Sequence, residues 1–517
     1  MMAIHLCGDP PLSIRSGLLA VSFFPFLFAC ALKVNPISIL TGISHARLQI
    51  YHQSFAFGMF FFGMVHTIPI LWQYSHEKGF AYLKMAYDES QFFWTGTVCI
   101  CLVFWILCSS IGVFRNFSYR FFVVQHIISV ATLLGFLFKH VESLLMSHYY
   151  LWAAVAMWLF SIVVRSCLVL YSSEFFASRR AQVDIQTVTN YPLDDEKAST
   201  PGGETIRLSF STPLRWRPGQ HIYVRFPGFA VAQAHPFSIM SLPNQSRTNS
   251  QLVLLAKVHR GTTCKVFNYV KAHHSKERTF SDEVNTKADS DVTNVVDLEQ
   301  QEPGFVKEHC RSISPQLEVD PAIQQSMIQS AQVVAFLDGP YGFTTDPASY
   351  DHVLLCAGGT GIAHVFPIAH HLLRRCAEGK PNVITKRLRL VWSTHSTGLL
   401  DWIEADLKTL LALKEKLSLQ VDLDIYVTGE AMGSAHQTFV QTLVTAYGIR
   451  ANVYSILEEE IHRAIKMESK SMAVYVCGPT GLAHDMSNSV ADANWELAKG
   501  NMGSLHDIYL DVESFNW

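Results

Sequence analysis

The stretch Arg47–Trp72, RLQIYHQSFAFGMFFFGMVHTIPILW, decides the fold of this chain. No Asp, Glu, Lys or Arg occurs from Leu48 to His76, and a bilayer span needs about 20 apolar residues. Within this run, His52 and His66 lie fourteen residues apart, close to four helical turns, so their side chains share one face. The stretch therefore predicts a membrane-spanning helix with two polar groups, which are costly in a bilayer and usually functional.

Four other runs have no charged residue: Ser16–Leu32, Ser90–Phe114, Phe121–Phe138 and His148–Val164. With the first stretch they predict five transmembrane helices, at about 14–33, 49–73, 92–113, 121–141 and 148–171. One such run could be a buried core helix, but five in succession with short polar breaks argue against that reading. Lys and Arg favour the breaks after the first and third helices, which predicts a cytosolic C-terminal region.

A second histidine pair repeats the spacing of the first. His126 and His140 lie fourteen residues apart in the fourth predicted helix, which runs in the same direction as the second. We therefore expect His52 to pair with His126 at an inner site and His66 with His140 at an outer site. Imidazole is a regular axial ligand of haem iron. The alternative is hydrated histidines at helix ends. Glycines between the paired histidines would let a flat macrocycle approach or would serve helix packing: Gly58, Gly63 and Gly135.

Composition divides the chain of 517 residues into regions. Hydrophobic residues make up 49% and charged residues 16%, below the roughly 25% charged of a soluble chain. The net charge of −3 shows no excess of basic residues of the kind that indicates nucleic-acid binding. Short strands with Pro/Gly turns begin near 181, and alternating strands and helices begin near 351. We expect a transmembrane haem domain at 1–175, a flavin domain at 181–345 with a disordered insertion near 272–328, and a nucleotide domain at 350–517.

Two segments of the second region are candidates for flavin contacts. The segment Trp216–Gly228, WRPGQHIYVRFPG, alternates like a strand of a small β-barrel. The segment HPFS then offers amides and a hydroxyl to a flavin: His235, Pro236, Phe237 and Ser238. Cations and a helix N-terminus after the next strand could neutralise a pyrophosphate: Lys257, Arg260, Gly261 and Thr262.

Two glycine turns mark the third region. An apolar strand runs into one turn and then into a helical pattern, an order that cradles phosphates: Gly358, Gly359, Thr360 and Gly361. A second strand ends at Cys477, Gly478 and Pro479, where ligands bind in such sheets. A plain loop is the alternative for each turn. The given sequence finishes with ESFNW, where Trp517, or otherwise Phe515, could cover a flavin ring; the alternative is simple packing in the core. Trp517, Phe515 and Cys477 are the candidate catalytic residues.

In their order, these motifs resemble the fungal ferric-chelate reductases of the ferric reductase/NADPH oxidase superfamily. They are the His-x13-His pairs, PGQH, HPFS, GPYG, GGTGI, VCGP and ESFNW. The resemblance implies an all-α haem bundle, a β-barrel FAD-binding domain and an α/β NAD(P)-binding domain of the ferredoxin-NADP reductase type. It also implies two b-type haems held by residues matching His52, His66, His126 and His140, and FAD and NADPH as cofactors.

The chain departs from this family at three points. The family has six or more spans, and five are counted here, so the missing helix would precede residue 14. Relatives usually place a basic residue after the VW strand, where this chain has Ser393, Thr394 and His395, so NADH is not excluded. The segment Trp158–Ser166 lacks an aspartate that relatives often have.

We therefore expect a transmembrane metalloreductase that serves iron acquisition. Electrons would pass from cytosolic NADPH through FAD and two b-type haems to extracytoplasmic ferric chelates, or Cu²⁺. The expected surroundings are membrane lipid, in the plasma membrane or otherwise the vacuolar membrane, and a high-affinity iron permease/oxidase system as partner. Two alternatives stay open: a superoxide-generating NADPH oxidase, and a truncated non-catalytic remnant.

Overall fold

The computed structural model describes residues 12–41, 43, 45–142, 145–172, 180–186, 204–230, 233–243, 250–259, 261–273, 329–395, 398–429 and 442–513. It divides into two compact units, Met1–Cys167 and Leu168–Trp517. Arg260, Phe515, Trp517 and nearly all of the predicted insertion lie outside the described residues.

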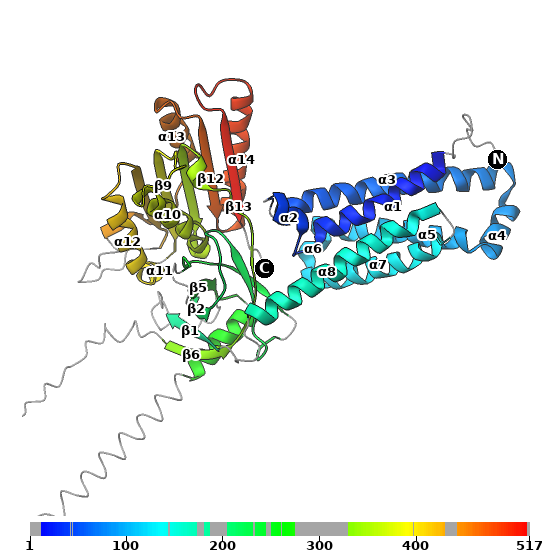
Figure 1. Cartoon of the computed structure of the whole chain (residues 1–517), viewed down its shortest axis with the longest axis horizontal. Coiled ribbons are helices and arrows are strands. Elements are labelled where there is room, and N and C mark those ends of the chain that lie inside the picture. Colours follow the sequence, from blue (N-terminus) through cyan, green and yellow to red (C-terminus); the bar gives the residue numbers. More distant parts are fainter. Residues whose placement is uncertain are drawn as a thin grey trace, which may run out of the picture. The chain divides into compact units, whose positions relative to one another are not determined.

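Five long helices run side by side in the first unit (Figure 1). They are α1 (Leu12–Ala31), α3 (His45–Glu77), α5 (Gln91–Ser109), α7 (Tyr119–His140) and α8 (His148–Ser172). Each is long and apolar enough to cross a membrane, which confirms the predicted spans. Short helical segments connect them: α2 (Pro36–Thr41), α4 (Phe80–Glu89), α6 (Gly112–Phe117) and η1 (Leu145–Ser147).

The helices of this bundle are apolar all round, as membrane helices are. Phe24, Leu133 and Leu151 are buried between them, whereas Phe61 and Trp72 are exposed on the outer surface. A soluble protein would not leave so many large apolar side chains in water, so these faces are suited to lipid. The most extensive contacts between these helices are within two pairs, α1 with α3 and α5 with α7, and α3 also contacts α5.

Two antiparallel sheets form the first part of the second unit. One has the order β5-β2-β1-β6, with β1 (Arg180–Gln186), β2 (Thr205–Thr212), β5 (Ser250–Lys257) and β6 (Gln329–Val334). The other has the order β4-β3-β7, with β3 (His221–Arg225), β4 (His235–Ser238) and β7 (Phe336–Tyr341). Buried and half-buried residues alternate along β3, and both sheets contribute to one apolar core.

The described strands do not close into the expected barrel. A single bridge, between Ile239 and Leu254, joins the two sheets. The strand before this bridge, β4, has only four residues, and its Pro236 has no N–H to donate to a ladder. The described residues therefore form two sheets around a shared core.

A doubly wound parallel sheet follows. Its order is β11-β10-β9-β8-β12-β13. The strands are β8 (His352–Gly358), β9 (Arg387–Thr394), β10 (Gln420–Val427), β11 (Val444–Tyr447), β12 (Ser471–Cys477) and β13 (Asp507–Glu513). One face packs on α10 (Ile362–Ala377) and α12 (Glu404–Lys414), and the other on α13 (Val453–Lys466) and α14 (Thr480–Ala498). Short turns η5 (Pro347–Ser349), η6 (Gly359–Gly361) and α11 (Gly398–Asp401) complete this part.

The strand order of this sheet reverses between β8 and β12. Ligands of such sheets bind outside the carboxyl ends of the strands at this switch point. Both glycine turns of the sequence follow these two strands, so the fold brings them to one edge.

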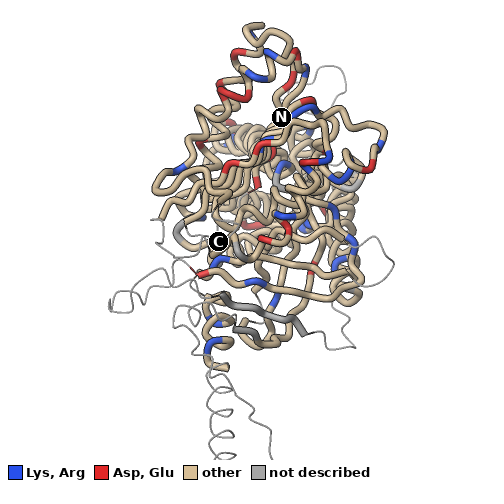
Figure 2. The backbone as a smooth tube through the Cα atoms, turned by 90° about the vertical axis from the view of Figure 1, so that its left-hand side faces the viewer, with Lys and Arg blue, Asp and Glu red and all other residues tan. Residues whose placement is uncertain are grey.

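Acidic and basic residues are interspersed over the second unit (Figure 2). Two arginines of β9 are buried, and carboxylates neutralise them. Arg387 donates to Glu460 of α13 at 2.8 Å and to Asp422 of β10, and Arg389 donates to Asp424 at 2.7 Å. These ion pairs fix α13 and β10 against β9, because a buried charge without its partner is costly.

Candidate functional site

The structure brings the predicted histidines of α3 and α7 together in pairs. The ring centres of His66 and His140 lie 6.1 Å apart, and their planes are 80° apart. At the other end of the helices, His126 interacts electrostatically with His52. The two pairs therefore lie between the same two helices, one pair toward each end.

The first pair has a spacing that suits one shared iron. Metal–imidazole bonds are about 2 Å long, so two imidazoles on opposite sides of one metal hold their ring centres about 6 Å apart. The observed 6.1 Å between His66 and His140 matches this value. The residues present thus fit a haem with two histidine ligands.

Backbone carbonyls orient three of the four rings. Nδ1 of His52 lies 3.0 Å from the backbone oxygen of Leu27. Nδ1 of His66 lies 2.6 Å from that of Ser13, and Nδ1 of His140 lies 3.2 Å from that of Phe92. A carbonyl only accepts, so each Nδ1 carries the proton and donates it. Histidines that bind metals commonly donate their second ring N–H in this way, which leaves Nε2 as the ligand atom.

Glycines on the neighbouring helices make room for two of these rings. A Cβ at Gly17 would lie 2.7 Å from Nδ1 of His66, and one at Gly96 would lie 2.7 Å from Cε1 of His140. The glycines considered from the sequence have other surroundings. A Cβ at Gly58 would contact Phe23 and one at Gly63 would contact Ile100, as in helix packing, and Gly135 has open space.

Gly96→Ala is expected to weaken haem binding at the outer site. The added methyl would push the His140 ring away from the Phe92 carbonyl, and losing such outer contacts costs roughly 10–100-fold in metal affinity. Haem content per protein, read from the reduced-minus-oxidised spectrum, checks this. Gly135→Ala is the matched control, since its Cβ meets nothing within 4 Å. Equal haem loss in both variants would contradict the prediction.

The two glycine turns of the nucleotide part lie against each other at the switch point. A Cβ at Gly361 would overlap the carbonyl oxygen of Cys477, and one at Gly358 would lie 2.5 Å from Cδ of Pro479. Trp392, fully buried on β9, donates from Nε1 to the Gly359 oxygen at 2.9 Å and fixes the first turn. Sequence reasoning missed this tryptophan, although a buried indole needs an acceptor.

A group of polar side chains lies beside the second turn. Ser238 of β4 makes a hydrogen bond with the buried thiol of Cys477, and burial raises the pKa of this thiol. Glu513, at the end of β13, pairs with His221 of β3 at 3.0 Å. Burial opposes ionisation of Glu513, but His221 and His364 lower its pKa overall. The candidates Ser238 and Cys477 are thus brought together. Glu513 and His221 lie in the ESFNW and PGQH motifs, but the sequence analysis gave neither residue a role.

Lowering the pH is expected to destabilise this part of the protein. His364 is buried, and burial lowers its pKa below the ordinary value of 6.5, although the nearby carboxylate of Glu513 acts in the opposite direction. Between the two pKa values of His364, the unfolded chain therefore binds a proton that the folded chain does not bind. The stabilisation is fully present above pH 6.5 and is lost as the pH falls through the lowered pKa.

Thermal unfolding of the purified protein between pH 8 and pH 5.5 checks this, with flavin release as the signal. The Tm should be constant at high pH and fall below about pH 6.5. His364→Gln, which does not titrate, should make the fall in Tm shallower. Part of the fall should persist, because burial also lowers the pKa of His352 in the same unit. A wild-type Tm that is independent of pH would contradict the prediction.

The candidate flavin residues occupy β4 and the end of β5. His235, Pro236, Phe237 and Ser238 form β4 itself, and Lys257 is exposed at the end of β5. Gly261 has a φ of +115° and precedes a helix at 262–273, and Thr262 donates to Gln233 at 2.9 Å. The N-terminus of this helix is suited to a phosphate group.

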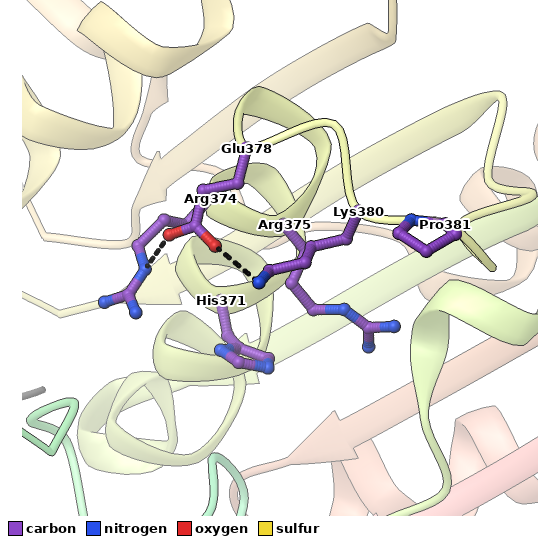
Figure 3. Close-up of a pocket in the computed structure, with 6 residues that line it drawn as sticks. All are labelled: His371, Arg374, Arg375, Glu378, Lys380 and Pro381. Carbon is purple, nitrogen blue, oxygen red and sulfur yellow. Dashed lines mark hydrogen bonds and ion pairs between the residues drawn. The ribbon is translucent and has the colours of Figure 1, made fainter.

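A surface pocket of about 330 Å³ lies apart from these groups (Figure 3). It is lined by His371, Arg374, Arg375, Glu378, Lys380 and Pro381. Glu378 pairs with Arg374 and Lys380, and Asp346 pairs with Arg375. The pocket is at the C-terminal end of α10, whereas the glycine turn is at its N-terminal end. The 16 residues of α10 span about 24 Å, so this pocket is not the nucleotide site.

In the described part of the chain, five apolar helices, a two-sheet part and a doubly wound sheet define an integral membrane protein with two glycine turns at the switch point of its parallel sheet. Three family models match the chain in this order. They are "Ferric reductase like transmembrane component" at residues 16–138, "FAD-binding domain" at 191–345 and "Ferric reductase NAD binding domain" at 350–491. The chain belongs to the ferric reductase family. This family binds haem, and the chain carries FAD-binding and NAD-binding domains.

Several fungal proteins are similar to this chain. "Probable cell surface ferric reductase kap2" of Aspergillus oryzae is 27% identical over 78% of this chain and 46% of its own length. "Ferric/cupric reductase transmembrane component 7" of Saccharomyces cerevisiae is 25% identical over 85% and 59%. "Ferric reductase transmembrane component 1" of Schizosaccharomyces pombe is 25% identical over 76% and 61%. The chain thus spans about half to three-fifths of the length of these relatives.

Solved structures show only a weak likeness. A ferredoxin NADP+ reductase from Neisseria gonorrhoeae is similar at a TM-score of 0.31 and 15% identity, over 61% of this chain and 94% of that one. A flavohemoglobin from Malassezia yamatoensis is similar at 0.33 and 14%, over 98% and 97%. At these scores the likeness carries no further conclusion.

Proposed function

We propose that the chain is a transmembrane metalloreductase that passes electrons from NAD(P)H, through FAD and two b-type haems, to ferric or cupric chelates. One observation carries this proposal: the spacing of His66 and His140, on helices able to cross a membrane, suits a shared iron. FAD-binding and NAD-binding domains in the same chain supply the donor side. The relatives named as ferric or ferric/cupric reductases supply the acceptor class.

In this proposal, His52 and His126 hold the inner haem and His66 and His140 the outer one. The carbonyls of Leu27, Ser13 and Phe92 keep protons on Nδ1 of three histidines and thereby direct Nε2 to the iron. Bound flavin accepts electrons in pairs and releases them singly, and haem carries single electrons. The bundle excludes water around the histidines, because its core is apolar.

The nucleotide is proposed to lie over the two glycine turns, where bare backbone at Gly358–Gly361 and Cys477–Pro479 can approach its phosphates. The flavin is proposed to contact β4, with Ser238 between flavin and Cys477 and with Trp517 or Phe515 covering the ring. Hydroxyls and an imidazole, rather than Arg or Lys, follow β9 at Ser393, Thr394 and His395. Both NADPH and NADH are therefore proposed as donors, with NADPH first.

The proposed organisation has a haem domain at 1–175, a flavin domain at 181–345 that completes a barrel, and a nucleotide domain at 350–517, in a ferredoxin-NADP reductase type of arrangement. The second unit is proposed to lie in the cytosol, because Lys and Arg favour that side of the bundle. The plasma membrane is the proposed location, and an iron permease/oxidase system the proposed partner.

The test is a reduced-minus-oxidised spectrum of membranes that contain the protein, with NADPH and then NADH as donor. A b-type haem signal that appears with donor and is reoxidised by ferric citrate without oxygen supports the proposal. A haem signal that only oxygen reoxidises, with superoxide released independently of iron, would favour an oxidase. A wild-type protein without haem would refute both.

A further inference from the structure

The two helix pairs of the bundle share one register. In the first pair, α1 offers the carbonyls of Ser13 and Leu27, fourteen residues apart, to His66 and His52 of α3. In the second pair, α5 offers the carbonyl of Phe92 to His140 of α7. Counting fourteen residues along α5 leads to Ile106, whose carbonyl is the expected acceptor for the fourth histidine.

Side-chain contacts support this register at the other end of the second pair. Trp105 donates to Gln125 at 3.0 Å, and Gln125 donates to Ser109 at 2.9 Å. These contacts place Ile106 opposite the residue that follows Gln125, which is His126. Yet Nδ1 of His126 is buried and has no hydrogen-bond partner in the described part of the chain.

The Ile106 carbonyl differs from the other three carbonyls in the residue that lies four positions further along its helix. After Ser13, Leu27 and Phe92 this residue is small and has no hydroxyl: Gly17, Ala31 and Gly96. After Ile106 it is Ser110, whose hydroxyl donates to the Ile106 oxygen at 2.6 Å. The hydroxyl of Ser109 also approaches this oxygen, at 3.2 Å, but Ser16 and Thr95 approach the Ser13 and Phe92 oxygens in the same way, at 3.0 and 3.3 Å. The additional bond from Ser110 therefore distinguishes the Ile106 oxygen from the carbonyls that accept from a histidine.

We propose that Ser110 is a positioning residue that withholds the Ile106 carbonyl from His126, so that the two ligands of the inner haem differ. This inference rests on the proposed function. His52 donates from Nδ1 to Leu27, which raises its basicity as a ligand, whereas His126 has no such support. A less basic ligand stabilises ferric iron less, so Ser110 makes the inner haem easier to reduce. The outer haem, with both ligands supported, is the more strongly held in the ferric state.

The experiment compares haem midpoint potentials in membranes that contain wild type, Ser110→Ala or Ser110→Gly. Either substitution frees the Ile106 carbonyl for His126 and reproduces the surroundings of Ala31 or Gly96. We expect the equilibrium ratio of ferric to ferrous haem at the inner site to rise about tenfold. This corresponds to a fall in midpoint potential of about 59 mV for one electron. The outer potential should not change.

Ser54→Ala is the matched control. Ser54 makes the same kind of bond, to the Ile50 oxygen at 2.9 Å, but on an exposed face of the bundle. Its loss should leave both potentials unchanged. A His66→Ala background, which keeps only the inner haem, assigns the component that shifts.

The outcomes separate the two proposals. Absence of haem in the wild type would refute the proposed function itself. Two haems in the wild type, with the same potentials in Ser110→Ala, Ser110→Gly and Ser54→Ala, would overturn this inference alone. Loss of haem from both Ser110 variants would also overturn it, because the serine would then be needed for assembly.

Discussion

His66→Ala is expected to remove the outer haem and to abolish metal reduction, while NAD(P)H still reduces the flavin. The variant loses one of the two imidazoles whose rings are 6.1 Å apart, and His140 alone does not hold the site. The reductase part belongs to the other compact unit, so its chemistry should persist. The b-type absorbance should fall to about half, and the ferric-chelate rate to background.

His76→Ala is the control for this variant. His76 is on the same helix, but its ring contact is with Trp72 of its own helix, at 4.9 Å. It should keep both haems and full metal reduction. Rapid mixing with NADPH gives the flavin rate of each variant. Loss of flavin reduction in His66→Ala would count against a serial path from flavin to haem.

Gly361→Ala is expected to stop NAD(P)H oxidation while leaving the haem bundle intact. Its methyl group would overlap the carbonyl of Cys477 and force the two glycine turns apart. Overpacking of this kind costs about 1–3 kcal/mol, and the displaced turns no longer present bare backbone to the nucleotide. The rate of flavin reduction at low NADPH should fall by about tenfold or more.

Gly481→Ala provides the comparison for this prediction. Gly481 is in the first turn of α14, two residues after Pro479 of the second glycine turn, but a Cβ there meets nothing within 4 Å. This variant should reduce flavin at the wild-type rate. Dithionite, which bypasses the nucleotide, should give the same haem spectrum in both variants. Normal flavin reduction in Gly361→Ala would mean that close contact of the turns is not needed.

Much of the fold follows from local sequence pattern. The uncharged runs predicted five membrane-spanning helices, and the described part of the structure has five helices that are long and apolar enough. Strand, glycine turn and helix in alternation predicted the parallel sheet around β8 and β12. Both depend on a property of consecutive residues, which is why a single sequence suffices. The described strands do not confirm the expected barrel, because closure depends on pairing between strands that are distant in sequence.

The details of the sites depend on contacts that no local pattern encodes. His221 and Glu513 are nearly 300 residues apart and meet only because β3 and β13 converge. Gly17 and Gly96 look like ordinary helix glycines until the register of the helix pairs is known. The spacing of fourteen between histidines was visible in the sequence. The equal spacing of the carbonyls that accept from these histidines was not visible, because every residue has a backbone carbonyl and the sequence does not show which of them accepts.

The paired register also bears on how the protein is made. Each histidine that has a carbonyl acceptor receives it from the neighbouring helix of its own pair, α1 with α3 or α5 with α7. Each histidine pair, by contrast, spans the two helix pairs. Two helical hairpins can thus leave the insertion machinery one after the other, with their ligands already oriented. Haem, held by one histidine from each hairpin, would then link the two hairpins in addition to the direct contact of α3 with α5.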